Sequence, residues 1–269
     1  MTVEVRTYIV FTMKEMKNDG YTLSTVVTAT KLIELIGYTG SATPSQIAKK
    51  LQLTRSNVHR LLATLQELGY VAEGLYNTYS LTFKLFELGN TIPHRRLLID
   101  VSRPSMLRLA QLTGYTVNNA VLYENEVLYI DKVEANAFLK LDRSIGNSDP
   151  VHSTSLGKAL LAFQKPEERQ RILSEIELFQ STPHTITEKE KFMAELEQIH
   201  SAGFAMDRRE LSMDLVCVAV PVFDCRGEVC SAVSVSGPSD RFTPDEAEKI
   251  VPDLKATSGE ITRKLCNEL

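Results

Sequence analysis

The chain has 269 residues, of which 43% are hydrophobic and 24% charged, a composition typical of a globular protein with about two domains. Its net charge of −4 is divided unevenly: residues 1–96 carry 11 basic and 7 acidic side chains, and the rest carries 19 and 27, so that only the first part suits nucleic-acid phosphates. The sequence has no membrane-spanning run, no secretory leader and no zinc-type Cys or His spacing, so we expect a cytoplasmic protein with reduced thiols, no metal and no cofactor.

The first part of the chain predicts helices. Residues 1–20 match no clear element beyond a strand-like stretch at 3–11, and we treat them as an N-terminal arm. From residue 24 an apolar stripe predicts a helix that ends near Gly37, and the stripe consists of Val27, Leu32, Leu35 and Ile36. Thr43-Pro44-Ser45-Gln46 is a capping box with proline at the first helical position, which predicts a short second helix.

Residues 54–69 predict a third helix whose polar face is suited to the major groove of DNA. Thr54 fits the N-cap and Gly69 the C-terminal cap, and the apolar stripe consists of Val58, Leu61, Leu62, Leu65 and Leu68. The opposite face gathers guanidinium, amide, imidazole and hydroxyl groups near its N-terminus. An ordinary surface helix with two arginines has the same pattern, so the neighbouring elements decide between the two interpretations.

These neighbours predict a winged helix-turn-helix. Gln52 and Leu53 form a tight turn between the second and third helices. Two short strands at 70–73 and 79–81 then flank a turn, and this hairpin is the wing. The candidate DNA contacts are Thr43, Lys49, Arg55, Ser56, Asn57, His59 and Arg60, with Arg60 as the base reader and Lys49 as a phosphate contact.

A helical linker at residues 83–101 separates the DNA-binding domain, residues 21–82, from the rest of the chain. We expect a helix at 82–90 that Pro93 ends or kinks, followed by an amphipathic helix from Leu97 to Thr113. The apolar stripe of residues 82–113 is a candidate dimer surface.

Residues 102–269 predict an α+β domain with an antiparallel sheet and flanking helices. Two hairpins supply the expected strands, at 117–123, 127–133, 216–223 and 229–236. The expected helices are at 157–164, 167–176 and 188–202, and a capping box at Thr243-Pro244-Asp245-Glu246 begins a C-terminal helix.

Several stretches together resemble the IclR family of bacterial transcription regulators, from Ser24 to the C-terminus. Besides the third helix they are Tyr79-Ser80-Leu81-Thr82, Leu88-Gly89, Arg143-Ser144-Ile145-Gly146, Ser153-Thr154-Ser155-Leu156-Gly157-Lys158-Ala159-Leu160-Leu161-Ala162 and Cys217-Val218-Ala219-Val220-Pro221-Val222-Phe223. Residues 79–89 and 219–224 look most similar to the members that control pectin and sugar-acid catabolism, including the repressor that senses 2-keto-3-deoxygluconate.

The resemblance implies a homodimer or homotetramer that binds a palindromic double-stranded DNA operator. It also implies that the second domain is GAF-like and binds a small carboxylate effector, for which 2-keto-3-deoxygluconate is a candidate. By position it assigns effector binding to Ser155, Leu156, Gly157, Asp207, Cys217, Ser234 and Ser236. Helix N-terminal amides near Gly157 favour an anion, and the Ser234 and Ser236 hydroxyls share one strand face. The sequence departs from the family pattern in Ser155, where alanine is more usual, and Asp214, where glycine is common.

The same residues allow other interpretations. Ser234 and Ser236 fit ordinary strand positions, and Cys217 fits a small buried apolar residue. His152 beside Ser153 suggests a serine hydrolase, although the sequence has no Gly-x-Ser-x-Gly elbow. Residues 207–210 fit a solvated charge cluster from which only Asp207 points inward. Cys225 and Cys230, on either side of a turn, allow a redox role but fit two unpaired thiols better.

The sequence therefore predicts a ligand-responsive DNA-binding transcription regulator, a repressor of carbohydrate or sugar-acid catabolism, and no enzyme. The alternative is a hydrolase-type enzyme with an accessory DNA- or protein-binding domain. The lack of a nucleophile motif, a metal spacing or a Gly-rich phosphate loop in the sequence favours the regulator.

Overall fold

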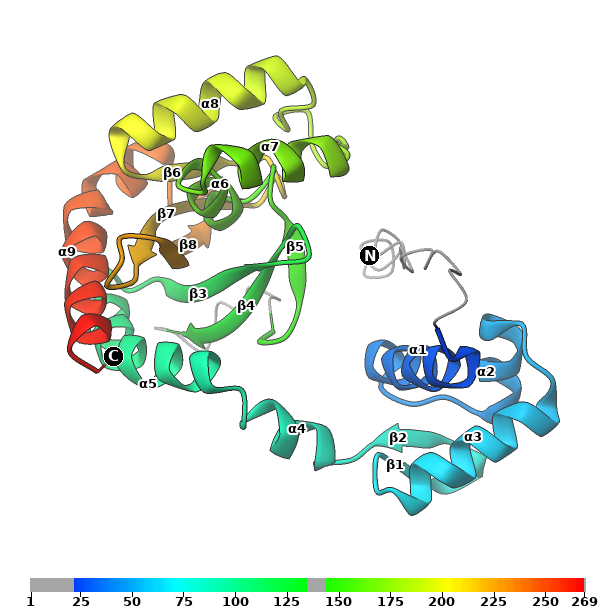
Figure 1. Ribbon diagram of the computed structural model, residues 1–269. Coiled ribbons are helices and arrows are strands. Elements are labelled where there is room, and N and C mark those ends of the chain that lie inside the picture. Colours follow the sequence, from blue (N-terminus) through cyan, green and yellow to red (C-terminus); the bar gives the residue numbers. More distant parts are fainter. Residues whose placement is uncertain (1–21, 135–143, 269) are drawn as a thin grey trace. The chain divides into compact units, whose positions relative to one another are not determined.

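A computed structural model describes residues 22–134 and 144–268 of the protein (Figure 1). The predicted arm at 1–20, with its strand-like stretch, and Arg143 lie outside the described residues. The chain divides into two compact units, Met1–Thr91 and Ile92–Leu269. Within the described ranges, no helix is long and apolar enough to cross a membrane.

The first unit has the element order of the predicted winged helix-turn-helix. Its elements are α1 (Ser24–Thr39), α2 (Pro44–Leu51), α3 (Arg55–Glu67), the antiparallel strands β1 (Val71–Glu73) and β2 (Tyr79–Leu81), and the short helix α4 (Lys84–Gly89). The apolar faces of the three helices meet the wing in one core, which includes Leu32, Ile36, Ile47, Val58, Leu62 and Val71. The wing is therefore anchored to the helices by its buried side.

Local sequence sets where the two helices of the DNA-binding motif begin. The amide of Gln46 donates to Thr43 Oγ1 at 3.3 Å, and the Gln46 side chain accepts from the Thr43 amide at 2.8 Å, which confirms the predicted capping box. At the start of α3, the Asn57 amide donates to Thr54 Oγ1 at 3.3 Å, as the N-cap prediction requires.

The predicted end of the first helix at Gly37 was wrong by two residues. α1 continues to Thr39 and ends at Gly40, whose φ of 75° is a left-handed conformation. Gly37 stays helical, and a Cβ there would lie 3.3 Å from Leu81 Cδ1 of β2. Its lack of a side chain therefore lets the wing approach the helix.

A six-stranded antiparallel sheet forms the centre of the second unit, in the order β5-β4-β3-β8-β7-β6. Its strands are β3 (Thr116–Tyr123), β4 (Glu126–Val133), β5 (Ser148–Pro150), β6 (Ala205–Arg208), β7 (Leu215–Phe223) and β8 (Val229–Pro238). The predicted hairpins β3-β4 and β7-β8 are confirmed. β5 and β6 were not predicted from the sequence, because edge strands of 3 and 4 residues carry too little alternation to be recognised.

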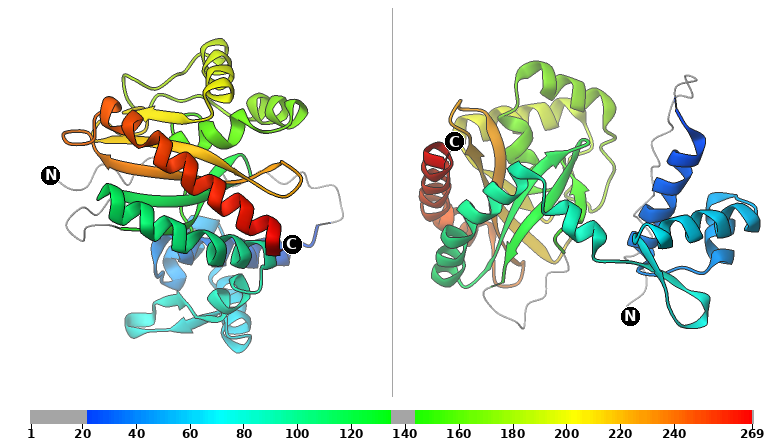
Figure 2. Two further views of the ribbon diagram at one scale, coloured as in Figure 1. Left: turned by 90° about the vertical axis from the view of Figure 1, so that its left-hand side faces the viewer. Right: turned by 60° about the horizontal axis from the view of Figure 1, so that its bottom comes forward.

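Helices cover both faces of this sheet, as expected for a GAF-like α+β domain. One face carries α5 (Pro93–Thr113) and α9 (Pro244–Glu268), and the other carries α6 (Ser155–Ala162), α7 (Pro166–Glu175) and α8 (Lys189–Ala202) (Figure 2). Val218 and Val220 of β7 join the core under α5 and α9, whereas Ala219 joins the core under α6. All eight residues of α6 are buried, and small strand residues such as Ala219 let this helix lie close to the sheet.

The helix that enters the second unit begins earlier than predicted. α4 ends at Gly89, before Pro93, but Pro93 is itself at the start of α5, and one helix continues to Thr113. The expected start at Leu97 was therefore wrong. Proline at the first helical position loses no hydrogen bond, because that amide has no intrahelical partner.

Candidate functional site

The polar face of α3 is open to solvent. Arg55, Ser56, Asn57, His59 and Arg60 are exposed. On the opposite side of the helix Val58, Leu62 and Leu65 are buried, whereas Leu68, at the end of the predicted apolar stripe, is exposed. In the described part of the chain, no hydrogen bond or ion pair engages the guanidinium groups of Arg55 or Arg60. These donors are therefore available to base edges or phosphates.

The two candidates on or before α2 have different surroundings. Lys49 is exposed in the last turn, next to an equally exposed Lys50 that the sequence analysis did not single out. Thr43 is half-buried, and its hydroxyl is engaged with the Gln46 amide and with Gln46 Oε1 at 3.0 Å. The structure thus gives the Thr43 hydroxyl a capping role, whereas Lys49 and Lys50 are free to meet phosphates.

In the second unit, strand register brings polar residues of four strands together. Asp207 of β6 pairs with Cys217 of β7, which in turn pairs with Ser236 of β8, and Ser234 of β8 pairs with Asn118 of β3. With the start of α6 they line one cavity of about 20 Å³. Six of the seven effector candidates line it, namely Ser155, Leu156, Asp207, Cys217, Ser234 and Ser236.

Asn118 links the two serines. Its Nδ2 donates to Ser234 Oγ at 3.4 Å and to Ser236 Oγ at 3.2 Å. Because each serine oxygen accepts from the amide, each hydroxyl keeps its own proton to donate to a ligand oxygen. Asn118 Oδ1 is buried and has no hydrogen-bond partner among the described residues. The serine hydroxyls therefore suit an anionic oxygen of a ligand, and Asn118 Oδ1 suits a hydrogen-bond donor on the same ligand.

The N-terminus of α6 begins at the cavity, but Gly157 does not line it. The Gly157 amide donates to the N-cap oxygen, Thr154 Oγ1, at 3.0 Å and is therefore not available to an anion. A Cβ at residue 157 would lie 2.4 Å from the backbone of Val151, so glycine permits this close approach. The helix amides left for a ligand are those of Ser155 and Leu156, whose residues line the cavity.

Asp207 is the buried acid of the cavity, with 1% of its surface exposed. Its Oδ1 accepts from the backbone amides of Glu210 at 2.6 Å and Leu211 at 3.4 Å, and its Oδ2 has no partner among the described residues. Burial, reinforced by the Glu210 carboxylate, raises the pKa of Asp207 to about 7 against the opposing effect of the amides and of Lys158. Asp207 therefore changes charge near neutral pH.

A fully buried lysine lies behind this acid. Lys158 Nζ of α6 is 2.7 Å from Glu210 Oε1 and 3.1 Å from Glu195 Oε1 of α8. Glu210 is 4% exposed, so the expectation of a solvated cluster with only Asp207 pointing inward was wrong for Glu210. The ammonium group of Lys158 compensates the charge of the Glu210 carboxylate, because a buried carboxylate needs a cation.

Comparison with known proteins identifies the family. A profile described as the IclR helix-turn-helix domain matches residues 25–74, and one described as Bacterial transcriptional regulator IclR C-terminal matches residues 91–263. The chain belongs to the IclR family. It is therefore a DNA-binding transcription regulator and not an enzyme.

Individual members of the family cover most of the chain. The chain is 34% identical over 244 residues to the HTH-type transcriptional regulator KdgR of Dickeya chrysanthemi, covering 90% of this chain and 80% of that protein. IclR of Thermotoga maritima superposes with a TM-score of 0.73 at 32% identity, covering 90% and 98% of the two chains. An IclR homologue from Microbacterium hydrocarbonoxydans, complexed with 4-hydroxybenzoate, superposes with a TM-score of 0.80 at 25% identity, covering 90% and 99%.

The surroundings of His152 agree with a regulator. His152 Nε2 lies 2.9 Å from the carbonyl oxygen of Phe179, and the ring packs edge-on against Phe179 and Phe192. Burial lowers the pKa of His152. Ser153 Oγ has no hydrogen-bond partner among the described residues, so the imidazole does not activate it, and the basis of the hydrolase interpretation is removed.

The described residues include all four cysteines of the chain. The four cysteines, all within the described ranges, form no disulfide, so Cys225 and Cys230 are separate thiols, as predicted. Among the described residues, no three His, Cys, Asp or Glu side chains gather in a way that would hold a metal.

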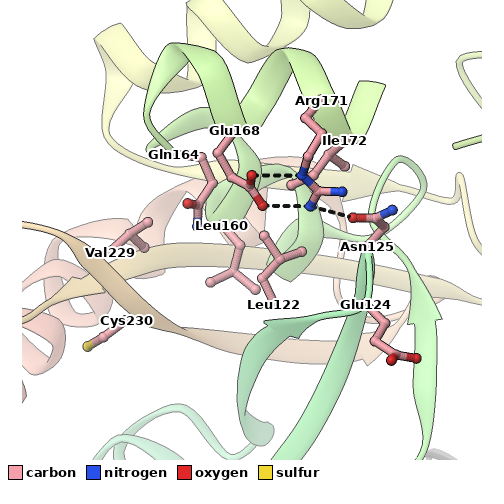
Figure 3. A pocket seen from close by; sticks show the side chains of 10 residues that line it. All are labelled: Leu122, Glu124, Asn125, Leu160, Gln164, Glu168, Arg171, Ile172, Val229 and Cys230. Carbon is pink, nitrogen blue, oxygen red and sulfur yellow. Dashed lines mark hydrogen bonds and ion pairs between the residues drawn. The ribbon is translucent and has the colours of Figure 1, made fainter. Parts of the chain in front are cut away.

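A larger opening of about 220 Å³ lies near the C-terminal end of α6, beside α7 and the β3-β4 turn (Figure 3). Its dominant cation, Arg171, donates to Glu168 Oε2 at 2.8 Å and Oε1 at 2.6 Å, to Glu175 at 2.8 Å and to Asn125 Oδ1 at 3.0 Å. These groups satisfy one another, whereas the smaller cavity holds unpartnered acceptors and free hydroxyl protons. We therefore assign the ligand site to the smaller cavity, because its polar groups are available to a ligand, although the other opening is larger.

The sequence analysis missed five residues that line the smaller cavity: Asn118, Tyr129, Thr154, Leu211 and Leu215. Asn118 left a usable signal, since an amide in a buried strand calls for an explanation. Thr154 directly precedes Ser155 and lies in the stretch 153–162 that carries the family resemblance. Tyr129, Leu211 and Leu215 join the site only through folding.

Proposed function

We propose that the protein is a repressor whose second unit binds a small carboxylate in the cavity at the start of α6, and that binding alters the affinity of the first unit for operator DNA. The observation that carries the proposal is the convergence of Ser234, Ser236 and the first amides of α6 on one cavity. Each of these groups can donate to an anionic oxygen. The 4-hydroxybenzoate complex of the Microbacterium relative supports a carboxylate ligand.

The polarity of the cavity orients the ligand. Its carboxylate lies against Ser234, Ser236 and the helix amides, where donors gather. Its hydroxylated end lies at Asp207, whose ionised form repels a carboxylate and accepts from hydroxyl groups. A sugar acid such as 2-keto-3-deoxygluconate meets both requirements, and the similarity of residues 79–89 and 219–224 to the sugar-acid repressors supports this choice.

The size of the cavity requires that it widens. A volume of about 20 Å³ holds roughly one water molecule, so a sugar acid does not enter the cavity in this state. Leu211 lines it from the connection between β6 and β7, and Leu215, the first residue of β7, lines it where that connection ends. An effector therefore displaces that connection when it binds. The second unit then has an effector-free and an effector-bound conformation, and the change between them alters DNA binding by the first unit.

Isothermal titration calorimetry of the full chain with 2-keto-3-deoxygluconate and pyruvate tests the proposal. A charge-assisted hydrogen bond contributes about 1.5–3 kcal/mol, so the double variant Ser234→Ala, Ser236→Ala should lose at least about tenfold in affinity for both ligands. Asp207→Ala should weaken the sugar acid more than pyruvate.

Ser231→Ala is the matched control. Ser231 lies on the same strand and is fully buried, but it pairs with Val222, which faces α5 and α9. Its substitution should leave effector affinity unchanged. If the sugar acid bound as well to the double variant and to Asp207→Ala as to the original chain, the effector site would lie elsewhere.

We further propose that Lys49, Arg55, Ser56, Asn57, His59 and Arg60 contact DNA, and that a homodimer or homotetramer binds a palindrome with half-sites about 10 bp apart or at a related spacing. Exposed apolar side chains at and after the wing support a dimer surface there, with Phe83 88% and Phe86 66% exposed. Arg60→Ala should lower affinity for the operator more than for random DNA. Lys49→Ala should lower both equally and flatten the salt dependence. Equal losses from both DNAs for Arg60→Ala would remove its role as a base reader.

A further inference from the structure

Two consecutive asparagines in the middle of the sheet point to its opposite faces. Asn118 lines the effector cavity together with the start of α6, whereas Asn119 contacts α5 on the other face. Both belong to β3, a central strand, and both are buried, with 4% and 0% of their surfaces exposed. A buried amide costs free energy unless it is hydrogen-bonded, so two in succession call for a reason beyond packing.

Asn119 and its neighbour across the sheet fix the middle of α5. Asn119 Nδ2 donates to Ser102 Oγ at 3.0 Å, and Ser102 Oγ donates to the Leu98 carbonyl at 2.5 Å. The next residue of the helix, Arg103, forms an ion pair with Asp131 of β4, and Asp131 is the register partner of Asn119. Two adjacent positions of α5 are thus bonded to two paired positions of the sheet.

The pairing of β3 with β4 is interrupted at the same point. Asn119 pairs with Asp131, but Ala120 pairs with Tyr129, so that Ile130 has no counterpart on β3. A bulge of this kind bends its strand and re-aims the side chains next to it. Here it lies between Tyr129, which lines the cavity, and Asp131, which contacts α5. The two faces of the sheet are therefore connected at its most deformable place.

The helix is weakened where the sheet contacts it. Pro104 lies inside α5 and has no amide proton, so one intrahelical hydrogen bond is missing from the turn that contains Ser102. Helices bend at proline, and a serine that bonds to the carbonyl four residues earlier adds to the bend. α5 begins at Pro93, just after the first unit ends at Thr91. A change in its bend therefore changes the direction in which the chain leaves the second unit.

We propose that β3 couples the effector cavity to α5 through Asn118 on one face and Asn119 on the other, and that α5 answers by changing its bend at Pro104. The proposal rests on the effector site proposed above. A ligand donor that binds Asn118 Oδ1 competes with the bonds from Asn118 to the two serines and shifts the middle of β3. Asn119 moves with the shared backbone, so its bond to Ser102 changes, and the helix settles in a second geometry.

The response of the full chain to 2-keto-3-deoxygluconate tests this coupling. Calorimetry gives the effector affinity, and fluorescence anisotropy gives the affinity for a duplex selected from a random-sequence pool with the unmodified protein. The ratio of DNA affinities with and without effector measures the coupling. The double variant Asn119→Leu, Ser102→Ala should change that ratio by about two- to tenfold, the range of one hydrogen bond, and keep the effector affinity within about twofold.

This double variant is chosen because it should fold. It replaces both bonded partners by apolar groups of similar shape, which leaves no buried donor unsatisfied, and it removes Asn119 Oδ1, an atom without a hydrogen-bond partner among the described residues. Ser105→Ala is the matched control. Ser105 is a buried serine of the same helix, but its hydroxyl accepts from Arg108 at 3.1 Å and from Lys264 of α9 at 3.4 Å, not from the sheet. Its substitution should leave the ratio unchanged.

A second measurement needs no effector. Asn118→Ala and Ser102→Ala alter opposite faces of the sheet and share no printed contact, so without coupling their effects on DNA affinity should multiply. With coupling through β3, the affinity of Asn118→Ala, Ser102→Ala should differ from that product by at least about threefold. The pair Asn118→Ala, Ser105→Ala should show no such difference.

The outcomes separate this coupling from the effector site itself. A ratio unchanged in Asn119→Leu, Ser102→Ala, or simple multiplication in the Asn118 and Ser102 cycle, would overturn the coupling and leave the effector site in place. An equal change for Ser105→Ala would overturn it as well, since any alteration of α5 would then suffice. If 2-keto-3-deoxygluconate did not alter DNA binding by the unmodified chain, the proposed function would fail instead, and the cycle alone would decide on the coupling.

Discussion

Replacing Asp207 with asparagine should make the protein more stable at alkaline pH and leave its stability unchanged at acid pH. The pKa of Asp207 rises from 3.8 to about 7 in the folded protein, chiefly through burial. Between about pH 4 and pH 7 the native state thus binds a proton that the unfolded state has released, so the free energy of unfolding falls as the pH rises through this window and levels off above it.

The size of the effect follows from that shift. About three pKa units at 1.36 kcal/mol each give about 4 kcal/mol of destabilisation above pH 7. Asparagine has no charge to bury, and its Oδ1 still accepts from the amides of Glu210 and Leu211. The free energy of unfolding of the variant should therefore exceed that of the unmodified chain by up to about 4 kcal/mol at pH 8 and by almost nothing near pH 4.

Urea unfolding of the full chain, followed by circular dichroism at several pH values, measures this difference. Subtracting the free energy of unfolding of the unmodified protein from that of the variant at each pH removes the contributions of the other titrating groups. Asp224→Asn is a control of opposite sign, because burial is outweighed by the backbone amides of Glu228 and Arg226 together with the Arg226 guanidinium, which hold the pKa of Asp224 below its usual value. That variant should lose stability at pH 8 relative to the unmodified chain. A stability difference for Asp207→Asn that stayed constant from pH 4 to pH 8 would refute the argument that Asp207 titrates near neutrality.

Effector binding should also change the protonation of Asp207. A carboxylate without hydroxyl groups, such as pyruvate, offers Asp207 no hydrogen bond, so its negative charge raises the pKa of Asp207 further and its binding above pH 7 should take up a proton. The charged groups around Asp207 are Glu210 and Lys158, which carry opposite charges. Calorimetry in phosphate and Tris buffers should give different apparent enthalpies for the unmodified chain and equal ones for Asp207→Asn. Equal enthalpies for both proteins would show that Asp207 keeps its charge state.

Three further substitutions test the packing and the caps. Lys158→Met should lower the free energy of unfolding by about 3–5 kcal/mol, because it leaves the buried Glu210 carboxylate without its cation; a urea denaturation change below 1 kcal/mol would contradict a buried ion pair. Gly157→Ala should cost about 1–3 kcal/mol in the same assay, since its Cβ would meet the Val151 backbone at 2.4 Å, and an unchanged melting temperature would show that α6 shifts freely. Thr43→Ala should cost about 1 kcal/mol in the transition of the first unit, measured by calorimetry, and should leave the transition of the second unit in place.

Most of the fold could be predicted from the sequence wherever short-range chemistry determines it. Thr43 and Thr54 mark helix starts, because a side-chain oxygen caps amides only three residues away. The apolar spacing of α3, and the apolar runs of β7 and β8 on either side of a turn, predict these elements directly. Where a residue serves a distant partner, the prediction failed: Gly37 looked like a helix end but instead makes room for Leu81.

The sequence by itself therefore determined the helices, the hairpins and the family, but only the tertiary structure decided how the site is built. Asp207, Cys217 and Ser236 are spread over thirty positions of the chain, and it is the pairing of β6, β7 and β8 that makes them neighbours. Tertiary folding also decided that Glu210 is buried against Lys158, 52 residues away, and that the pKa of Asp207 moves to about 7. Burial and cross-strand register depend on contacts between distant segments, and a pattern read along the chain contains no distance between them.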